Sequence, residues 1–244
     1  FMGDPGPVVC RSETEIESTI ESIRATFGGT LVLKSPFAAS GRGHGLMAPG
    51  ESLQGPIRSN RVRSLIQQGA IVVEPWVDRE FDFSVQFEMG ENELRRVGLT
   101  RQEIDPRGAW RATLVGPKFC RGLPGELARF LNETALPVYE PESELIRRLT
   151  EWIAESSFRG PVGIDAFVFR DGDGELQHRA VCEINPRYTM GRLAIELARK
   201  AAAGKWLRFS IGKGPVAPGA LVLNEPQSPS GWLGLMQVTD QPNS

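Results

Sequence analysis

The chain of 244 residues has few histidines and cysteines, which argues against several kinds of site. Its two histidines are His44 and His178, and its three cysteines, Cys10, Cys120 and Cys182, lie far apart. No Cys-x-x-Cys pair is present, so the sequence argues against a zinc site. The odd number of cysteines and their wide spacing indicate free thiols in a reducing compartment, and therefore a cytoplasmic protein.

The chain also lacks an excess of charge and a long apolar run. Its 28 basic and 30 acidic residues give a formal net charge of -2. Such a balance provides no general attraction to nucleic acid or to an anionic membrane. No apolar run approaches membrane-spanning length and no signal peptide is visible. We therefore expect small-molecule partners. Because the chain begins Phe1-Met2-Gly3, we also expect it to be a piece of a longer protein.

The glycine-rich stretch from Ser40 to Leu46 does not fit two common nucleotide-binding patterns. It reads Ser-Gly-Arg-Gly-His-Gly-Leu. Neither G-x-x-x-x-G-K-[ST] nor G-x-G-x-x-G matches it, because Leu46 stands where the last glycine of the second pattern is required. P-loop and Rossmann folds are therefore set aside.

Helical and strand patterns alternate along the chain. The clearest strand runs from Phe81 to Met89, where apolar residues alternate with polar ones, so we expect one buried face and one solvent-exposed face. Two further strands, near 162–169 and 176–184, are expected to form a hairpin around a turn at 171–174. Hairpins favour antiparallel sheets, so the predicted fold class is α+β. Further helices are expected at 12–27 and 189–203, with Ser12 and Thr189 as their N-caps, and at 57–68 and 142–158. The helix at 142–158 is amphipathic, and its apolar side is expected to carry Leu145, Ile146, Leu149, Trp152 and Ile153. Further strands are expected at 30–34, 70–73, 94–100, 109–115 and 220–223.

The segment Val181–Arg187 places three polar side chains at alternate positions after an apolar run. On a strand, residues two apart point to one face, so Glu183, Asn185 and Arg187 are expected to project together. Two oxygen ligands beside a cation form a seat for a metal-bound polyphosphate. Pro186 has no backbone N–H and is expected to end the strand there.

Four elements occur in a characteristic order: Lys34 with its glycine-rich connection, Glu74–Glu80, Asp165, and Glu183-x-Asn185-Pro186-Arg187. This order resembles the ATP-grasp superfamily of ATP-dependent carboxylate–amine or carboxylate–thiol ligases, over nearly the whole chain. Details such as Ser40-Gly41-Arg42-Gly43 are similar to a bacterial branch of that superfamily. The resemblance implies two lobes, each with an antiparallel sheet and helices, and a nucleotide between them. It implies a small lobe at 1–76, a large lobe at 77–205 and a C-terminal extension at 206–244 packed on the large lobe.

The resemblance assigns nucleotide-binding roles in the first part of the chain. Lys34 would contact the α- and β-phosphates; a solvent-exposed strand-end lysine is the alternative. Glu80 would hold the ribose hydroxyls, with Asp82 as the competing candidate. The other expected nucleotide contacts are the phosphate loop at Ser40, Gly41 and Gly43, and the adenine contacts at Glu74, Trp76 and Val77.

In the second part of the chain, the resemblance implies a magnesium site, with Mn²⁺ as the alternative ion. Its ligands would be Asp165, Glu183 and Asn185, with Asp165 facing Glu183 across the hairpin in a register that the spacing leaves open. Arg187 and Arg111 would act on the phosphoryl oxygens. A surface arginine on a strand is the alternative for Arg111.

The resemblance therefore implies an ATP- and magnesium-dependent ligase. It would activate a small-molecule carboxylate as an acyl phosphate and pass it to an amine or another nucleophile, most often forming a carbon–nitrogen bond. The alternatives are a small-molecule kinase of the same fold and a non-catalytic nucleotide-binding module. The family's members carry a preceding α/β domain, so a missing N-terminal domain or a homodimer would complete the site.

Overall fold

The computed structural model describes residues 6–35, 45–53, 56–67, 69–106, 108–201, 204–213, 215–225 and 231–242. Side chains of the helix at 56–67 are described from Val62 onward. The chain divides into two compact units. The smaller unit comprises Phe1–Asp78, Pro106–Ala109 and Arg170–Glu175. The larger unit comprises Arg79–Asp105, Trp110–Phe169 and Leu176–Ser244. No helix among the described residues is long and apolar enough to cross a membrane.

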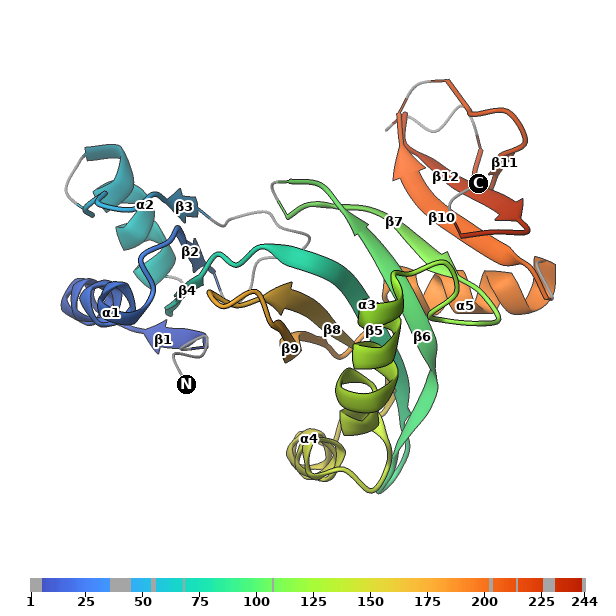
Figure 1. Cartoon of the computed structure of the whole chain (residues 1–244), viewed down its shortest axis with the longest axis horizontal. Coiled ribbons are helices and arrows are strands. Elements are labelled where there is room, and N and C mark those ends of the chain that lie inside the picture. Colours follow the sequence, from blue (N-terminus) through green and yellow to red (C-terminus); the bar gives the residue numbers. More distant parts are fainter. Residues whose placement is uncertain are drawn as a thin grey trace. The chain divides into compact units, whose positions relative to one another are not determined.

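The smaller unit contains a four-stranded antiparallel sheet with the strand order β1-β4-β2-β3 (Figure 1). Apolar side chains of the helices, among them Ile16, Ile20 and Val62, pack with Leu31, Ile71 and others of the sheet into one core. The elements are β1 (Val8–Cys10), α1 (Glu13–Thr26), β2 (Leu31–Lys34), β3 (Gly45–Met47), α2 (Pro56–Gln67) and β4 (Ile71–Pro75).

Helix α1 begins at the predicted residue. The Ser12 hydroxyl accepts a hydrogen bond from the Glu15 amide at 3.2 Å, which satisfies an amide that has no partner within the helix. The Glu15 carboxylate accepts from the amide of Arg11 at 2.6 Å, one residue earlier than the cap itself. Both side chains therefore fix the start of α1, as the Ser-x-x-Glu pattern indicates.

The larger unit is built on an eight-stranded sheet with the order β11-β12-β10-β7-β6-β5-β8-β9. Every strand pair whose register is known is antiparallel. The strands, which can be followed in Figure 1, are β5 (Arg79–Met89), β6 (Leu94–Ile104), β7 (Trp110–Val115), β8 (Gly160–Arg170), β9 (Leu176–Asn185), β10 (Trp206–Gly212), β11 (Leu221–Val222) and β12 (Leu233–Thr239).

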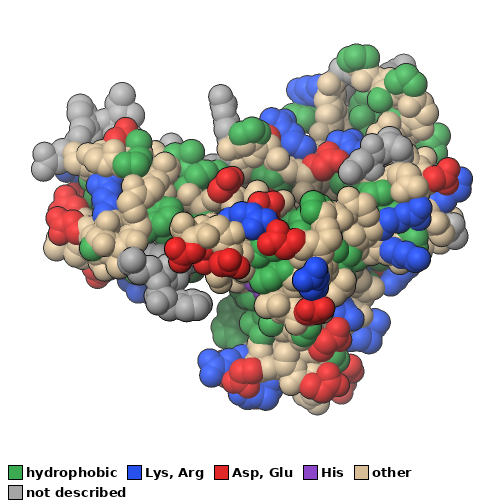
Figure 2. All heavy atoms as spheres, in the orientation of Figure 1, with side chains coloured by type: hydrophobic (Ala, Val, Ile, Leu, Met, Phe, Trp, Pro, Cys, Tyr) green, Lys and Arg blue, Asp and Glu red, His purple; other side chains and the backbone are tan. Residues whose placement is uncertain are grey.

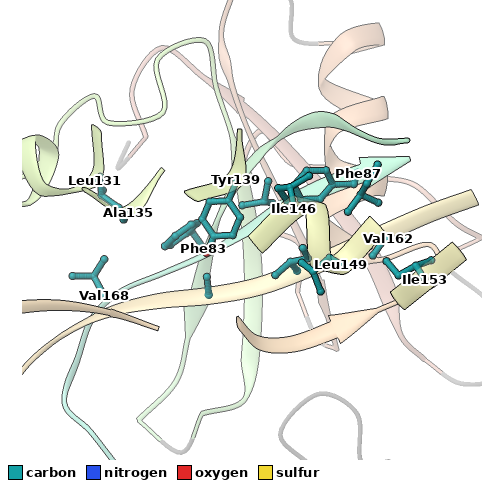
Figure 3. Close-up of a cluster of buried hydrophobic side chains, with 14 of the residues drawn as sticks. Phe83, Phe87, Leu131, Ala135, Tyr139, Ile146, Leu149, Ile153, Val162 and Val168 are labelled. Carbon is teal, nitrogen blue, oxygen red and sulfur yellow. The ribbon is translucent and has the colours of Figure 1, made fainter. Parts of the chain in front are cut away.

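The main core of the larger unit lies on the apolar face of β5. Phe83 and Phe87 point from that strand toward Tyr139, Ile146 and neighbouring side chains (Figure 3). The covering segment consists of α3 (Gly125–Phe130), a π-helical turn (Leu131–Ala135), a 3₁₀ turn (Pro137–Tyr139) and α4 (Glu144–Glu155). The opposite face of the sheet is covered by α5 (Met190–Ala201), whose Ile195 approaches Gly98 of β6.

Helix α4 is amphipathic, as its sequence predicts, with Ile146, Leu149 and Ile153 buried. Its outer side carries ion pairs of Arg147 and Arg148 with glutamates of the same helix. At the bottom of Figure 2, where α4 lies, basic and acidic side chains are intermixed. Trp152 was expected on the buried side, but its exposed fraction is 57%. It follows Glu151 on the charged side of the helix.

The C-terminal part contains more strand than the sequence suggested. Only 220–223 was expected to be extended, and β11 is found there. Strands β10 and β12 were missed, although they pair along their whole length and extend the sheet of the larger unit beyond β7. Arg208 and Ser210 interrupt the apolar pattern of β10. Arg208 forms an ion pair with Glu103 of β6 at 2.6 Å, a contact 105 residues away in sequence.

Candidate functional site

The hairpin of β8 and β9 brings two of the predicted ligand residues into contact. Asp165 lies in the middle of β8, and Asn185 is the last residue of β9. The Asn185 side-chain amide donates a hydrogen bond to the Asp165 carboxylate, with Nδ2 3.1 Å from Oδ2. Asn185 is buried, with an exposed fraction of 6%. The end of β9 is therefore fixed against the middle of β8 by two functional side chains.

Arg187 completes this group from the chain beyond the strand. Its guanidinium donates to the Asn185 carboxamide oxygen, with Nη2 2.7 Å from Oδ1. The Asn185 amide thus lies between a carboxylate and a guanidinium, and both of its polar ends are engaged. Arg187 itself is exposed, and its Nη1 lies 3.5 Å from the carbonyl oxygen of Tyr188.

Asp165 lies where its negative charge is disfavoured. Burial, above all, raises the pKa of its carboxyl to about 6, although a hydrogen bond from Ser84 lowers it. The negative charges of Glu183 and Asp82 raise the pKa further, and the positive charge of Arg187 lowers it. Two further carboxylates therefore act on the carboxyl of Asp165. A cation bound among them would relieve both the repulsion and the burial penalty.

The donor set suits a hard divalent ion shared with phosphate. Asp165, Glu183 and Asn185 offer only oxygen ligands, which Mg²⁺ prefers, and they are too few to enclose an ion without a further ligand. Within the described ranges, no group of three or more His, Cys, Asp or Glu side chains is placed to bind a metal. The two acids and one amide thus fit an ion that substrate phosphates help to hold, rather than an all-protein site.

In the smaller unit, Lys34 forms an ion pair with Glu74. Lys34 ends β2, Glu74 lies on the neighbouring strand β4, and the Glu74 side chain is almost fully buried. The carboxylate holds the ammonium group at the end of the sheet, where we expect the phosphate contact. The predicted loop residues Ser40, Gly41 and Gly43 lie outside the described residues.

The segment Glu74–Glu80, where nucleotide contacts are predicted, contains the sequence boundary between the two units. This boundary lies between Asp78 and Arg79. The backbone N–H of Trp76 donates to the carbonyl of Thr30 at 2.8 Å. This N–H is already engaged within the smaller unit, so an adenine contact at Trp76 would use its carbonyl or its ring. Val77 is half-buried.

The two candidate ribose ligands lie in different surroundings. Glu80 is exposed on β5. Asp82 is more buried and pairs with Arg79 at 2.8 Å. Burial raises the pKa of Asp82, while Arg79 lowers it. Because Asp82 acts electrostatically on Asp165, it belongs to the carboxylates of the hairpin site. The sequence contained a signal for this position of Asp82, because Asp82 and Ser84 stand two residues apart and therefore share a face of β5.

Arg111 lies where β6 and β7 pair irregularly, between Glu103 and Ile104. Its side chain is 65% exposed and forms an ion pair with Asp105 at 2.5 Å. This geometry fits the alternative of a surface arginine. A contact with a phosphoryl group would require Arg111 to leave Asp105.

One prediction about β5 was wrong. Its polar face was expected to be exposed to solvent, but Ser84 and Gln86 have exposed fractions of 0% and 1%. Both lie beneath the start of α5, where Thr189 caps the helix by accepting from the Arg192 amide at 3.0 Å. The cap at Thr189 was predicted, but its partner on β5 was not.

Comparisons with known proteins found a curated relative of part of the chain and solved structures of similar fold. No family model matches the chain. A curated relative, the [butirosin acyl-carrier protein]–L-glutamate ligase of Niallia circulans, is 26% identical over 180 residues, which are 74% of this chain and 38% of that protein. The chain therefore spans well under half the length of this relative.

Two solved structures resemble the fold at low sequence identity. The N5-carboxyaminoimidazole synthetase of Staphylococcus aureus, complexed with ADP, has a TM-score of 0.55 and 16% identity, covering 97% of this chain and 63% of that one. The biotin carboxylase domain dimer of the Hydrogenobacter thermophilus 2-oxoglutarate carboxylase, in complex with MgADP, ADP and bicarbonate, has a TM-score of 0.58 and 13% identity, covering 96% of this chain and 57% of that one. This likeness extends over both units of the chain.

Proposed function

We propose that this chain, which has the ATP-grasp fold, is the nucleotide-binding part of an ATP- and magnesium-dependent ligase. It would activate a small-molecule carboxylate as an acyl phosphate and transfer the acyl group to an amine or another nucleophile. Formation of a carbon–nitrogen bond is the version that the similarity to a glutamate ligase favours.

The observation that carries this proposal is the contact of Asp165 with Asn185, together with Arg187 on the same amide. It places a buried acid, an amide and an exposed cation within one hydrogen-bonded group. Such a group is of little use in a hydrolase that needs a protein nucleophile. It suits a phosphoryl transfer, in which the protein supplies position and charge.

In the proposed reaction, a substrate carboxylate oxygen attacks the γ-phosphorus of ATP and ADP leaves. The amine nitrogen then attacks the acyl carbon, inorganic phosphate leaves, and the amine proton passes to solvent. Asp165, Glu183 and Asn185 would hold Mg²⁺, which neutralises charge on the phosphates when bound. Arg187, steadied by Asn185, would bind the oxygens of the transferred phosphoryl group.

The smaller unit would bind the rest of the nucleotide. Lys34, held by Glu74, would contact the α- and β-phosphates, and the loop with Ser40, Gly41 and Gly43 would cover them. The segment Glu74–Val77 would receive the adenine, and Glu80 would receive the ribose.

The test measures ADP release by the chain, and by the complete protein that contains it, in a screen of carboxylates with and without amines. We expect ADP release that requires a carboxylate and an amine together. A stable phosphorylated product without an amine would instead indicate a kinase. Magnesium-dependent ATP binding without turnover by the complete protein would indicate a binding module.

Glu183→Ala tests the proposed metal site. Because Glu183 is exposed, we expect the protein to remain folded while magnesium-dependent turnover is abolished. Glu175→Ala, which removes another exposed carboxylate from the turn of the same hairpin, should retain activity. Full activity of Glu183→Ala would refute the assignment of the metal site.

A further inference from the structure

Gln86 lies between the two segments that carry the site, although no part of the proposed reaction uses it. We propose that Gln86 is a positioning residue, which sets the geometry of Asp165 and of the segment containing Arg187 through one buried amide. The inference rests on the proposed function, because it concerns the same metal and phosphate site.

The hydrogen bonds around Gln86 form a series in which Thr189, Gln86 and Ser84 each donate to the next group. The Thr189 hydroxyl donates to Gln86 Oε1 at 2.7 Å, and Gln86 Nε2 donates to Ser84 Oγ at 2.7 Å. Ser84 Oγ in turn lies 3.1 Å from the carbonyl oxygen of Ile164 and can donate to it. This orientation of the amide agrees with the bonds of Thr189, whose oxygen accepts from the Arg192 amide and whose proton is donated to Gln86 Oε1.

The two ends of this chain of hydrogen bonds lie next to the functional residues. Ile164 directly precedes Asp165, and Ser84 is the partner of Asp165 in register between β5 and β8. Thr189 follows Arg187 by two residues and begins α5. A shift of the Gln86 amide would therefore move both the acid and the segment that holds the cation.

Two glycines next to Gln86, Gly163 and Gly191, leave room for its amide. Gly163 on β8 is the partner of Gln86 in register, as is Gly98 on β6, but a Cβ at Gly98 would meet Ile195 of α5 instead. A Cβ at Gly163 would lie 3.1 Å from Gln86 Nε2 and 2.7 Å from Thr189 Cγ2. A Cβ at Gly191, in the first turn of α5, would lie 2.7 Å from Gln86 Nε2.

This close approach explains why an amide occupies the position. Gly163 and Gly191 allow β8 and α5 to approach Gln86 closely, so its Oε1 and Nε2 each meet a fixed partner in a site with no access to solvent. An apolar side chain of the same size would leave the hydroxyls of Ser84 and Thr189 without this partner. Partners behind the metal ligands commonly tune metal affinity by holding the ligands in place.

The experiment measures Mn²⁺ binding to the chain in the presence of a non-hydrolysable ATP analogue, from the electron paramagnetic resonance signal of free Mn²⁺. Gln86→Met keeps the length of the side chain and removes both hydrogen bonds. We expect its Mn²⁺ affinity to fall about tenfold, the low end for partners behind metal ligands. Thr189→Val should weaken binding in the same direction, whereas Thr189→Ser, which keeps the hydroxyl, should bind Mn²⁺ as the wild type does.

Gln102→Met is the control for loss of a half-buried amide on the same face of the sheet. Gln102 bridges Thr100, Trp110 and Thr113 and lies outside the series of hydrogen bonds that connects Thr189, Gln86, Ser84 and Ile164. Gln102→Met should lower the melting temperature without changing Mn²⁺ affinity. If Gln86→Met does not fold, the comparison of Thr189→Val with Thr189→Ser decides the question.

The outcomes separate the two proposals. Unchanged Mn²⁺ affinity in folded Gln86→Met, or in Thr189→Val, would overturn the positioning role while leaving the metal site intact. An equal loss in Gln102→Met would also overturn it, because the effect would then follow general destabilisation. A wild-type chain that binds no Mn²⁺ with the nucleotide analogue would refute the proposed function, and the positioning role with it.

Discussion

His178 should make the stability of the larger unit depend on pH in a way that a single substitution removes. The ring lies on the core side of β9, stacked on Phe83 with ring centroids 5.7 Å apart. Its Nε2 is 3.0 Å from the hydroxyl of Tyr139, which itself donates to the carbonyl of Ala180 at 2.7 Å. Since that hydroxyl proton is already used, His178 must be the donor, as a neutral ring protonated at Nε2.

Burial lowers the pKa of His178 to about 4, from an ordinary value of 6.5. The unfolded chain therefore binds a proton at a higher pH than the folded chain does, and stability falls as the pH drops through this range. Between about pH 7 and about pH 5, linkage gives a loss of about 2 kcal/mol, an upper value because the ring is only partly buried.

Asp165 acts in the opposite sense. Burial raises the pKa of Asp165 to about 6, so its folded carboxyl binds a proton before the unfolded one does. Acidification over the same interval then stabilises the fold by about 1 kcal/mol. The wild-type profile alone would mix both effects, so the assay compares wild type with His178→Gln by urea unfolding at several pH values. We expect the stability advantage of the wild type to shrink by about 2 kcal/mol toward pH 5. A difference that is constant with pH would refute the burial of a neutral His178.

Two further substitutions test the packing beneath α5 and the ion pair of the smaller unit. Gly191→Ala places a methyl group 2.7 Å from Gln86 Nε2 and should cost about 1–3 kcal/mol in unfolding experiments, whereas Gly172→Ala, with no atom within 4 Å of the new group, should be near neutral. Equal effects would contradict the close approach of α5. Lys34→Met removes the cation paired with buried Glu74 and should cost about 3 kcal/mol, while Lys34→Met combined with Glu74→Leu should recover most of that stability; a single variant as stable as the wild type would argue against a buried pair.

The sequence predicted local structure well. Ser12 and Thr189 cap their helices as expected, and Phe83 and Phe87 lie in the core as their alternation indicates. These features depend on neighbours within a few residues. The α+β class followed from the predicted hairpins, and the ATP-grasp likeness followed from the order of the motifs.

Long-range contacts account for what the sequence did not reveal. Gln86 looks like a solvated residue on a half-buried strand until Thr189, 103 residues later, covers it. Arg208 weakens the apolar pattern of strand β10. The sheet accommodates this residue because Arg208 forms an ion pair with Glu103. The electrostatic influence of Asp82 on Asp165 was hidden for the same reason, since only the strand order brings β5 beside β8.

The position of β9 in the sheet has a consequence for any study of the site. Among the described residues, this strand stands last in the strand order, with β8 as its neighbour on one side. The backbone groups on its outer side can template pairing with a strand of another molecule, and charged residues and proline are what discourage such pairing. Glu183 and Pro186 would thus discourage the strand from pairing with another molecule, in addition to the metal-binding role proposed for Glu183. Replacing Glu183 therefore also removes a barrier to self-association, so light scattering belongs beside every activity measurement on that variant.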